Sequence, residues 1–322
     1  MSSIRLTGLV GSHPLGALAA FGLLRIVSDM QQFKTPRLSW KLEQDWLAVL
    51  HTTDLNVAED QLKTRLLCAL VDRQQERAKE KFLTWSDDIK VDPQEFERIL
   101  KEQVKICSLQ QRETTDFLAA FGSEIIRARS TGDVKPTALH MTAGQQKFLK
   151  SAREVASSLS PCRPAKRGED AATIQREIEN AFTRALFGPW HREDRLHSLG
   201  WDPSTEALYA LLATAPGDEK PFSERGAIWL AFEALPLFPS FPIGSRLQTR
   251  SFDNRSESFS WPIWQPAISV NTLASLLALP ELIAQNPEMK ELIPRGIVAV
   301  YRSICERDAN GRGIFRNAVL YA

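Results

Sequence analysis

The chain has 322 residues, and its 40 Lys and Arg nearly cancel its 39 Asp and Glu, which leaves a formal net charge of +1. This balance argues against a surface that is basic throughout, and therefore against salt-driven binding of nucleic acid over the whole surface. Hydrophobic residues make up 43% of the chain and charged residues 25%, which excludes a disordered or fibrous protein and suggests about two domains or one large one.

The first elements predicted along the chain are a strand, a turn and a helix. Residues 4–10 alternate weakly, and a Gly-Ser-His-Pro turn follows, in which Ser12 is placed to cap the helix and Pro14 suits its first turn. The helix, residues 15–27, has a face of small residues. Such a face lets another backbone approach closely, which fits tight packing in the core or the approach of a partner chain or nucleic acid. The small residues are Gly16, Ala19, Ala20 and Gly22.

The next hundred residues are predicted to be mostly helical. A second strand is expected at 37–41, and a short hairpin at 82–91 with two aspartates in its turn. Apolar residues recur at helical spacing on both sides of that hairpin. The expected helices cover residues 58–80, 93–107 and 115–126.

The second half of the chain mixes helices, strands and loops rich in aromatic residues and proline. Residues 131–136 read as a loop, and residues 161–170, which hold proline, glycine and three basic residues, read as a linker. Helices are expected at 142–159, 171–187, 205–213, 224–235 and 270–279. Hairpins are expected to pair 246–252 with 256–264 and 296–303 with 313–320.

These elements together predict a helix-rich α+β fold with small antiparallel sheets or hairpins. We expect a mostly helical region at 1–160, the linker at 161–170, and a mixed α+β region at 171–322. No apolar run is long enough to cross a bilayer, and the four widely spaced cysteines favour unpaired thiols in a reducing compartment. The sequence therefore predicts a cytoplasmic protein without a membrane partner.

Two motifs could carry chemistry, and neither fits a known pattern well. The glycines of residues 8–13 have the spacing of neither a dinucleotide nor a nucleotide loop, so no cofactor is expected. One cluster of His and carboxylate residues could bind a metal, but it lacks the i,i+4 pair of a helical zinc site, and a charged surface loop is the simpler reading. The cluster comprises His191, Asp194, His197 and Asp202. We therefore predict no catalytic residue and no metal ligand.

The local distribution of charge is more informative than the total. Six basic residues lie between Arg127 and Arg153, where Asp133 is the only acid, and basic residues continue into the 161–170 segment. A second basic strip, at residues 246–255, lies close to Trp261. Basic residues beside aromatic ones suit neutralisation of phosphates combined with stacking of bases, although a solvated surface explains each strip alone.

Six phrases of the sequence carry a further indication. They are LTGLVGSHPLGALAAFGLLR (6–25), DFLAAFGSE (116–124), MTAGQQKFL (141–149), GWDP (200–203), GAIWLAFEALPLFP (226–239) and GRGIF (311–315). Together they resemble the CRISPR-associated proteins of type I-G, formerly I-U, from end to end of the chain. This chain has His13 where those relatives more often have Asn, and Gly200 where an Arg is expected.

The resemblance implies a component like the large subunit of an RNA-guided surveillance complex, or like an extension of its helicase-nuclease. It implies no catalytic residues, since a separate helicase-nuclease cleaves the target. The large subunit reads the short motif beside the target and helps to hold the duplex and the displaced strand.

The sequence thus predicts a non-catalytic subunit of a type I CRISPR DNA-interference complex in antiviral defence. Its expected partners are the CRISPR RNA (crRNA), the target DNA, other subunits and the helicase-nuclease. The alternatives are a metal-dependent nuclease or hydrolase, and a protein–protein adaptor without nucleic-acid contact. The residues expected to contact nucleic acid are His13, Arg127, Arg129, Lys147, Lys150, Arg153, Lys166, Arg167, Arg246, Arg250, Arg255 and Trp261.

Overall fold

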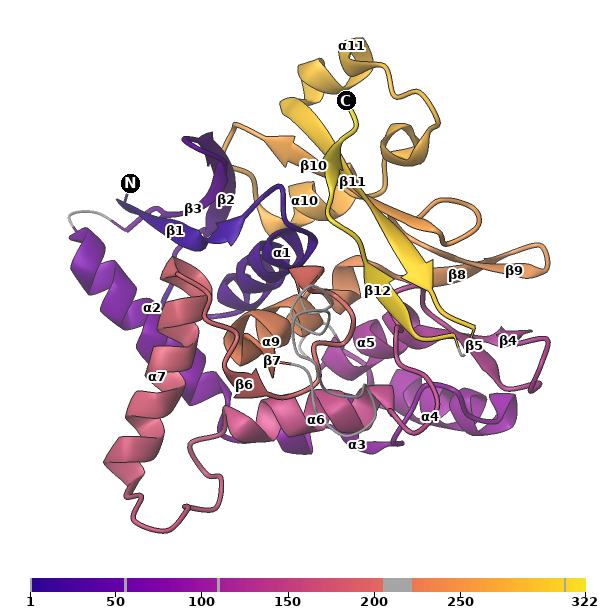
Figure 1. Cartoon of the computed structure of the whole chain (residues 1–322), viewed down its shortest axis with the longest axis horizontal. Helices are drawn as coiled ribbons and strands as arrows, with labels where there is room; N and C mark the ends of the chain where they lie inside the picture. Colours follow the sequence, from indigo (N-terminus) through magenta and orange to yellow (C-terminus); the bar gives the residue numbers. More distant parts are fainter. Residues whose placement is uncertain (1, 55–56, 109–110, 205–221, 310) are drawn as a thin grey trace, which may run out of the picture.

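A computed structural model describes residues 2–54, 57–108, 111–204, 222–309 and 311–322. It confirms the predicted α+β class, because helices alternate with several small antiparallel sheets (Figure 1). The helix expected at 205–213 lies outside the described residues. Among the described residues, no helix is both long and apolar enough to cross a membrane.

The central element is helix α1 (Pro14–Ser28), which is buried along almost its whole length. It packs against α9 (Arg225–Glu233), and both lie in the middle of the molecule in Figure 1. A Cβ atom at Gly22 would lie only 1.8 Å from the carbonyl oxygen of Leu230, so the contact requires glycine. The small-residue face of α1 therefore serves packing within the core.

A three-stranded antiparallel sheet with the order β1-β3-β2 lies beside α1. Helix α7 packs against β1, as does α2. The sequence prediction included β1 and β2 but missed β3, whose apolar run was assigned to a helical region. The bounds are β1 (Ser2–Val10), β2 (Arg37–Leu42), β3 (Trp46–Thr52), α2 (Glu59–Arg73) and α7 (Ala171–Phe187).

A layer of helices packs near α9, which also contacts α1. The hairpin predicted at 82–91 is wrong, because Phe82 and Leu83 are buried on a short helix and Phe82 stacks on Phe117 with 4.0 Å between ring centroids. The helices of this layer are α3 (Lys81–Thr84), α4 (Pro93–Ile106), α5 (Glu113–Phe121) and α6 (Phe148–Ser158), with a 3-10 turn, η1 (Arg77–Lys79), before α3.

The C-terminal sheet confirms the predicted terminal hairpin. Strand β11 (Ile297–Arg307) pairs with β10 (Ser258–Trp264) on one edge. It also pairs with β12 (Gly313–Phe315) and β13 (Val319–Leu320). Two short helices, α10 (Val270–Leu276) and α11 (Met289–Leu292), lie between β10 and β11 in the chain.

The hairpin predicted between 246–252 and 256–264 is wrong. Strand β9 (Arg246–Thr249) instead pairs with β8 (Ser240–Ile243) across a two-residue turn that contains Gly244 at φ +57°. Only an isolated bridge, Phe252 to Phe259, joins the two predicted strands.

Three hairpins gather at one end of the molecule, at the right of Figure 1. They are β4–β5, β8–β9 and β11–β12, where β4 is Gly122–Arg127 and β5 is Val134–Pro136. A smaller ladder pairs β6 (Asp194–Arg195) with β7 (Phe222–Ser223). Residues 161–170 form the connection between α6 and α7, and the regions on both sides of it contribute to one hydrophobic core.

Candidate functional site

A groove with a volume of about 1050 Å³ lies where the three hairpins meet. The turn after β4 forms one side, and the turn between β8 and β9 together with residues 254–257 forms another. The end of β11 and Gly311 complete it. Together with Lys90, segments from four separate parts of the chain therefore build one concave surface.

Cations dominate this basic groove. Seven Lys and Arg residues line it, against one carboxylate, Glu257. Within the described part of the chain, none of the seven forms an ion pair with a carboxylate, so their charges add rather than cancel. They are Lys90, Arg127, Arg129, Lys135, Arg246, Arg255 and Arg307.

Two of these cations are held in place by backbone carbonyls. Arg307 donates to the carbonyl oxygens of Ala138 at 3.0 Å and His140 at 3.2 Å, and Lys90 donates to that of Thr142 at 3.5 Å. Burial lowers the pKa of Lys90, and the nearby Arg307 lowers it further against the opposing effect of Asp88. A carbonyl fixes the position of a cation without removing its charge, so the groove keeps a positive field.

The groove joins both basic strips that the sequence indicated. Arg127 and Arg129 come from the first strip, and Arg246 and Arg255 from the second, although more than a hundred residues separate them. Sequence reasoning missed Lys90, Lys135 and Arg307 as site residues, although Lys135 belongs to the first strip. Two aspartates, Asp87 and Asp88, lie just before Lys90 and cancel its charge in a count along the sequence. No local feature of the sequence distinguishes Arg307.

The remaining basic residues of the first strip lie elsewhere. Lys150, Arg153 and Lys166 line a separate depression of about 650 Å³. Arg153 pairs with Asp87 and donates to the carbonyl oxygens of Leu83 at 2.5 Å and Ser86 at 2.7 Å, so its charge is largely compensated.

Lys147 and Arg167 of the predicted set do not line the basic groove either, and Lys166 has an acidic neighbour as well. The Lys166 ammonium lies 3.6 Å from a Glu169 carboxylate oxygen, and that of Lys147 lies 3.9 Å from Asp88. Arg167 is exposed. Lys147 precedes the first residue of α6, whereas Lys150 and Arg153 lie within the helix.

Two predicted contact residues are corrected by their burial. Trp261 is 0% exposed, and its indole N–H donates to the carbonyl oxygen of Gly11 at 2.8 Å, so it has no free face for a base. Arg250 is half-buried and donates to the carbonyl oxygens of Leu237 and Ala274 at 3.2 and 3.4 Å. Trp261 therefore serves the interior, and the two carbonyls anchor the half-buried Arg250 side chain.

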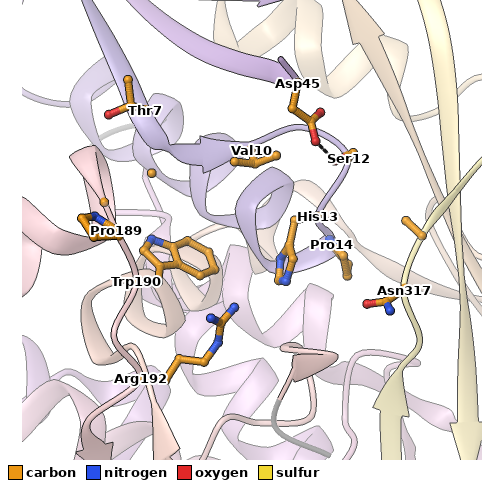
Figure 2. Close-up of a pocket in the computed structure, with 13 residues that line it drawn as sticks. Thr7, Val10, Ser12, His13, Pro14, Asp45, Pro189, Trp190, Arg192 and Asn317 are labelled. Atoms are coloured by element: carbon orange, nitrogen blue, oxygen red, sulfur yellow. Dashed lines mark hydrogen bonds between the residues drawn. The ribbon is translucent and has the colours of Figure 1, made fainter. Parts of the chain in front are cut away.

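His13 lies at a second cavity, about 510 Å³ in volume, at the N-terminus of α1 (Figure 2). Its side chain, rather than that of Ser12, caps the helix, because Nδ1 accepts the N–H of Gly16 at 3.4 Å. Its Nε2 lies 3.5 Å from Oδ1 of the buried Asp202, whose Oδ2 accepts from Arg192 at 2.7 Å. Burial opposes ionisation of Asp202, but His13 and Arg192 hold the pKa of that carboxyl below its usual range.

The predicted His and carboxylate cluster is dispersed over different partners. Asp194 pairs with Arg184 and Arg225, Asp202 with His13 and Arg192, and His197 Nε2 lies 2.9 Å from the Gln146 side-chain oxygen. Among the described residues, no group of three or more His, Cys, Asp or Glu side chains is arranged to hold a metal ion. All four cysteines are unpaired, as the sequence predicted.

The glycines of residues 8–13 are explained by close packing. A Cβ atom at Gly8 would lie 2.6 Å from the carbonyl oxygen of Ala185, and one at Gly11 would lie 2.8 Å from the Ile263 side chain. No protein-family model, curated protein or solved structure matches the chain. The function is therefore argued from the residues of this chain.

Proposed function

We propose that the protein is a non-catalytic, nucleic-acid-binding subunit of a type I CRISPR DNA-interference complex, and that the basic groove is its contact surface. One observation carries the nucleic-acid part. Seven cations, five from the three hairpins and two, Lys90 and Arg255, from neighbouring loops, converge on one groove with a single carboxylate and no ion pair among the described residues. The CRISPR part is supported by the resemblance of the six sequence phrases.

The groove suits a phosphate backbone better than bases. No Phe, Tyr or Trp is among the described residues that line it, so it offers no stacking platform. Arg and Lys contacts to phosphates position a nucleic acid without reading its sequence. Binding at the groove should therefore depend strongly on salt and weakly on sequence.

The expected partners are crRNA and target DNA, the other subunits and the helicase-nuclease. The formal net charge of +1 supports a role within an assembly, because one basic face on a nearly neutral protein provides limited affinity on its own. The guide RNA would supply the sequence specificity.

The test removes three exposed groove cations together, in the variant Arg129→Ala/Arg246→Ala/Arg255→Ala. Binding of the full chain to labelled single-stranded RNA and duplex DNA is measured by fluorescence anisotropy over a series of salt concentrations. If all three contact phosphates, the salt slope should fall by about 2 for a single strand and about 3 for a duplex.

The matched control is Lys41→Ala/Lys101→Ala/Lys290→Ala, which removes the same charge from side chains that do not line the groove and are 57%, 69% and 76% exposed. It should change the slope little. Equal slopes for the groove variant and the wild-type protein would refute the groove as the contact surface. Co-purification with partner subunits without any oligonucleotide binding would favour an adaptor.

A further inference from the structure

The cavity beside His13 is separate from the basic groove and has a different chemistry. Four segments build it: the end of β1 with the turn into α1, Asp45 between β2 and β3, residues 188–192, and the loop after β12. Its volume of about 510 Å³ is within the usual range for small-molecule pockets. Figure 2 shows its labelled side chains converging from these segments.

An aromatic wall lines one side of the cavity. The indole N–H of Trp190 donates to the carbonyl oxygen of Ala185 at 3.1 Å, which fixes the ring. The His13 ring meets it nearly at right angles, with 5.4 Å between centroids, and the Arg192 guanidinium lies 5.6 Å from the indole centroid. A fixed indole at a cavity surface offers a flat group a partner for packing.

Polar side chains, among them Asp45, also line the cavity. The carboxylate of Asp45 accepts from the Ser12 hydroxyl and from the backbone N–H of Trp46, one bond on each oxygen. A carboxylate has about four acceptor sites, so Asp45 can accept two more hydrogen bonds. Asp45 and Arg192 both line the cavity, and Figure 2 shows Asp45 next to Ser12 above the turn into α1 and Arg192 below Trp190, with His13 between them.

The balance of charge argues against a phosphate as the recognised group. Asp202 neutralises Arg192, and Asp45 adds a negative charge to the lining. A flat, neutral group that both donates and accepts hydrogen bonds fits this lining better than an anion does.

We propose that this cavity binds one nucleobase, and that guanine is the base that fits it best. The N1–H and N2–H₂ groups of guanine can donate to the two oxygens of one carboxylate, and its O6 and N7 accept from a guanidinium. Asp45 and Arg192 supply this pair of partners, and Trp190 supplies the packing surface.

The base could belong to a strand or to a free nucleotide. Gly311 lines the basic groove and Asn317 lines the cavity, and only β12 and its flanking residues separate them in the chain. A strand in the groove could therefore place a base in the cavity, and for this source the inference rests on the proposed function. If the base belongs to a free nucleotide, the inference does not depend on the proposed function.

The experiment titrates the full chain with the 5′-monophosphates of guanosine, adenosine, cytidine and uridine by isothermal calorimetry. Single-stranded oligonucleotides that differ at one position provide the second arm. GMP should bind most tightly, or G at one position should be preferred. Trp190→Ala should weaken binding of all four nucleotides, that of GMP about fivefold or more, because every base has a face that stacks. Asp45→Asn should weaken binding of GMP about tenfold, with little change for UMP.

The control for Asp45→Asn is Glu43→Gln, which changes a carboxylate in the same turn that does not line the cavity. It should leave the binding of GMP unchanged. If Trp190→Ala fails to fold, as judged by circular dichroism, Asp45→Asn still tests the base contact. Equal affinity for all four nucleotides together with no base preference in the oligonucleotides, or binding of GMP that is unchanged by Asp45→Asn, would overturn the inference.

Failure of this inference can be distinguished from failure of the proposed function. A protein that binds strands with a salt slope reduced by the groove variant, but shows no base preference, lacks only the base site. A protein that prefers GMP but binds no strand has the base site and refutes the nucleic-acid role of the groove.

Discussion

Glu233 at the end of α9 is fully buried, yet it accepts hydrogen bonds from two arginines of other elements. Arg77 bonds to both of its oxygens, at 2.6 and 2.7 Å, and Arg25 of α1 bonds to one of them. Burial opposes ionisation of Glu233, but the charges of Arg77, Arg73 and Arg25 outweigh it and lower the pKa of this carboxyl. Since Glu113 bonds Arg25, Arg73 and Arg77 as well, a single network joins α1, α2, α5 and α9.

Removal of Glu233 should therefore be costly. Glu233→Ala leaves buried guanidinium groups without a principal partner, and we expect the free energy of unfolding in urea to fall by about 3–5 kcal/mol. The control Glu102→Ala breaks an exposed pair with Arg98 and should leave stability nearly unchanged. A fall for Glu233→Ala that is no larger than that of the control would contradict a structural role for the network.

Individual site residues were predictable only where exposure could be inferred. Arg129 and Arg255 lie in polar turns, and such turns are exposed in most folds, so the sequence identified them. The expectation of an exposed Trp261 was wrong, because the exposure of this side chain depends on long-range packing. The carbonyl of Gly11, 250 residues away in the chain, holds Trp261 in the interior.

Among the elements, α1 shows what a sequence predicts well. Its apolar spacing and its proline at the first turn gave its bounds to within one residue at each end. Strand β3 and the β4–β5 hairpin were missed. β3 has no alternating pattern because it is the central strand, buried over much of its length. β4 directly follows α5, and Phe117, Phe121 and Ile125 continue one helical spacing across Gly122 at the junction.

The contact between α1 and α9 gives a prediction at this scale. In Gly22→Ala the added Cβ atom meets the backbone of α9 at Leu230, and backbone cannot yield as a side chain can. The free energy of unfolding should fall by about 3 kcal/mol or more, despite the better helix propensity of Ala. Ser28→Ala, at the last residue of the same helix, is the control for propensity. Urea unfolding measures both variants, and equal stability of the two would contradict the close approach.

For the molecule as a whole, acid should reduce stability through two histidines. Burial lowers the pKa of His51 and of His140, so their folded-state values lie below the unfolded value of about 6.5. As the pH falls below about 6.5, the unfolded chain takes up protons that the folded chain does not, and stability declines.

Burial is the main cause that raises the pKa values of Asp29 and Glu80. The folded chain therefore binds protons at these two carboxyl groups more readily than the unfolded chain does, which stabilises the fold as the pH falls further. The histidine contribution is therefore isolated as a difference. Urea unfolding of the wild-type protein and of His51→Asn/His140→Asn is compared at about pH 7.5 and about pH 5.5. The stability lost between these pH values should be smaller in the variant. An equal or larger loss would contradict the prediction.

The basic groove has a consequence for the folding of the chain. Seven like charges from hairpins and loops far apart in sequence come together only in the folded state, and no carboxylate pairs with them in the described residues. Their mutual repulsion opposes the assembly of the three hairpins, and the rest of the core must overcome it. A polyanion seated in the groove would remove that repulsion. It would therefore bind the three hairpins to one another, and their association should be stronger with the polyanion than without it.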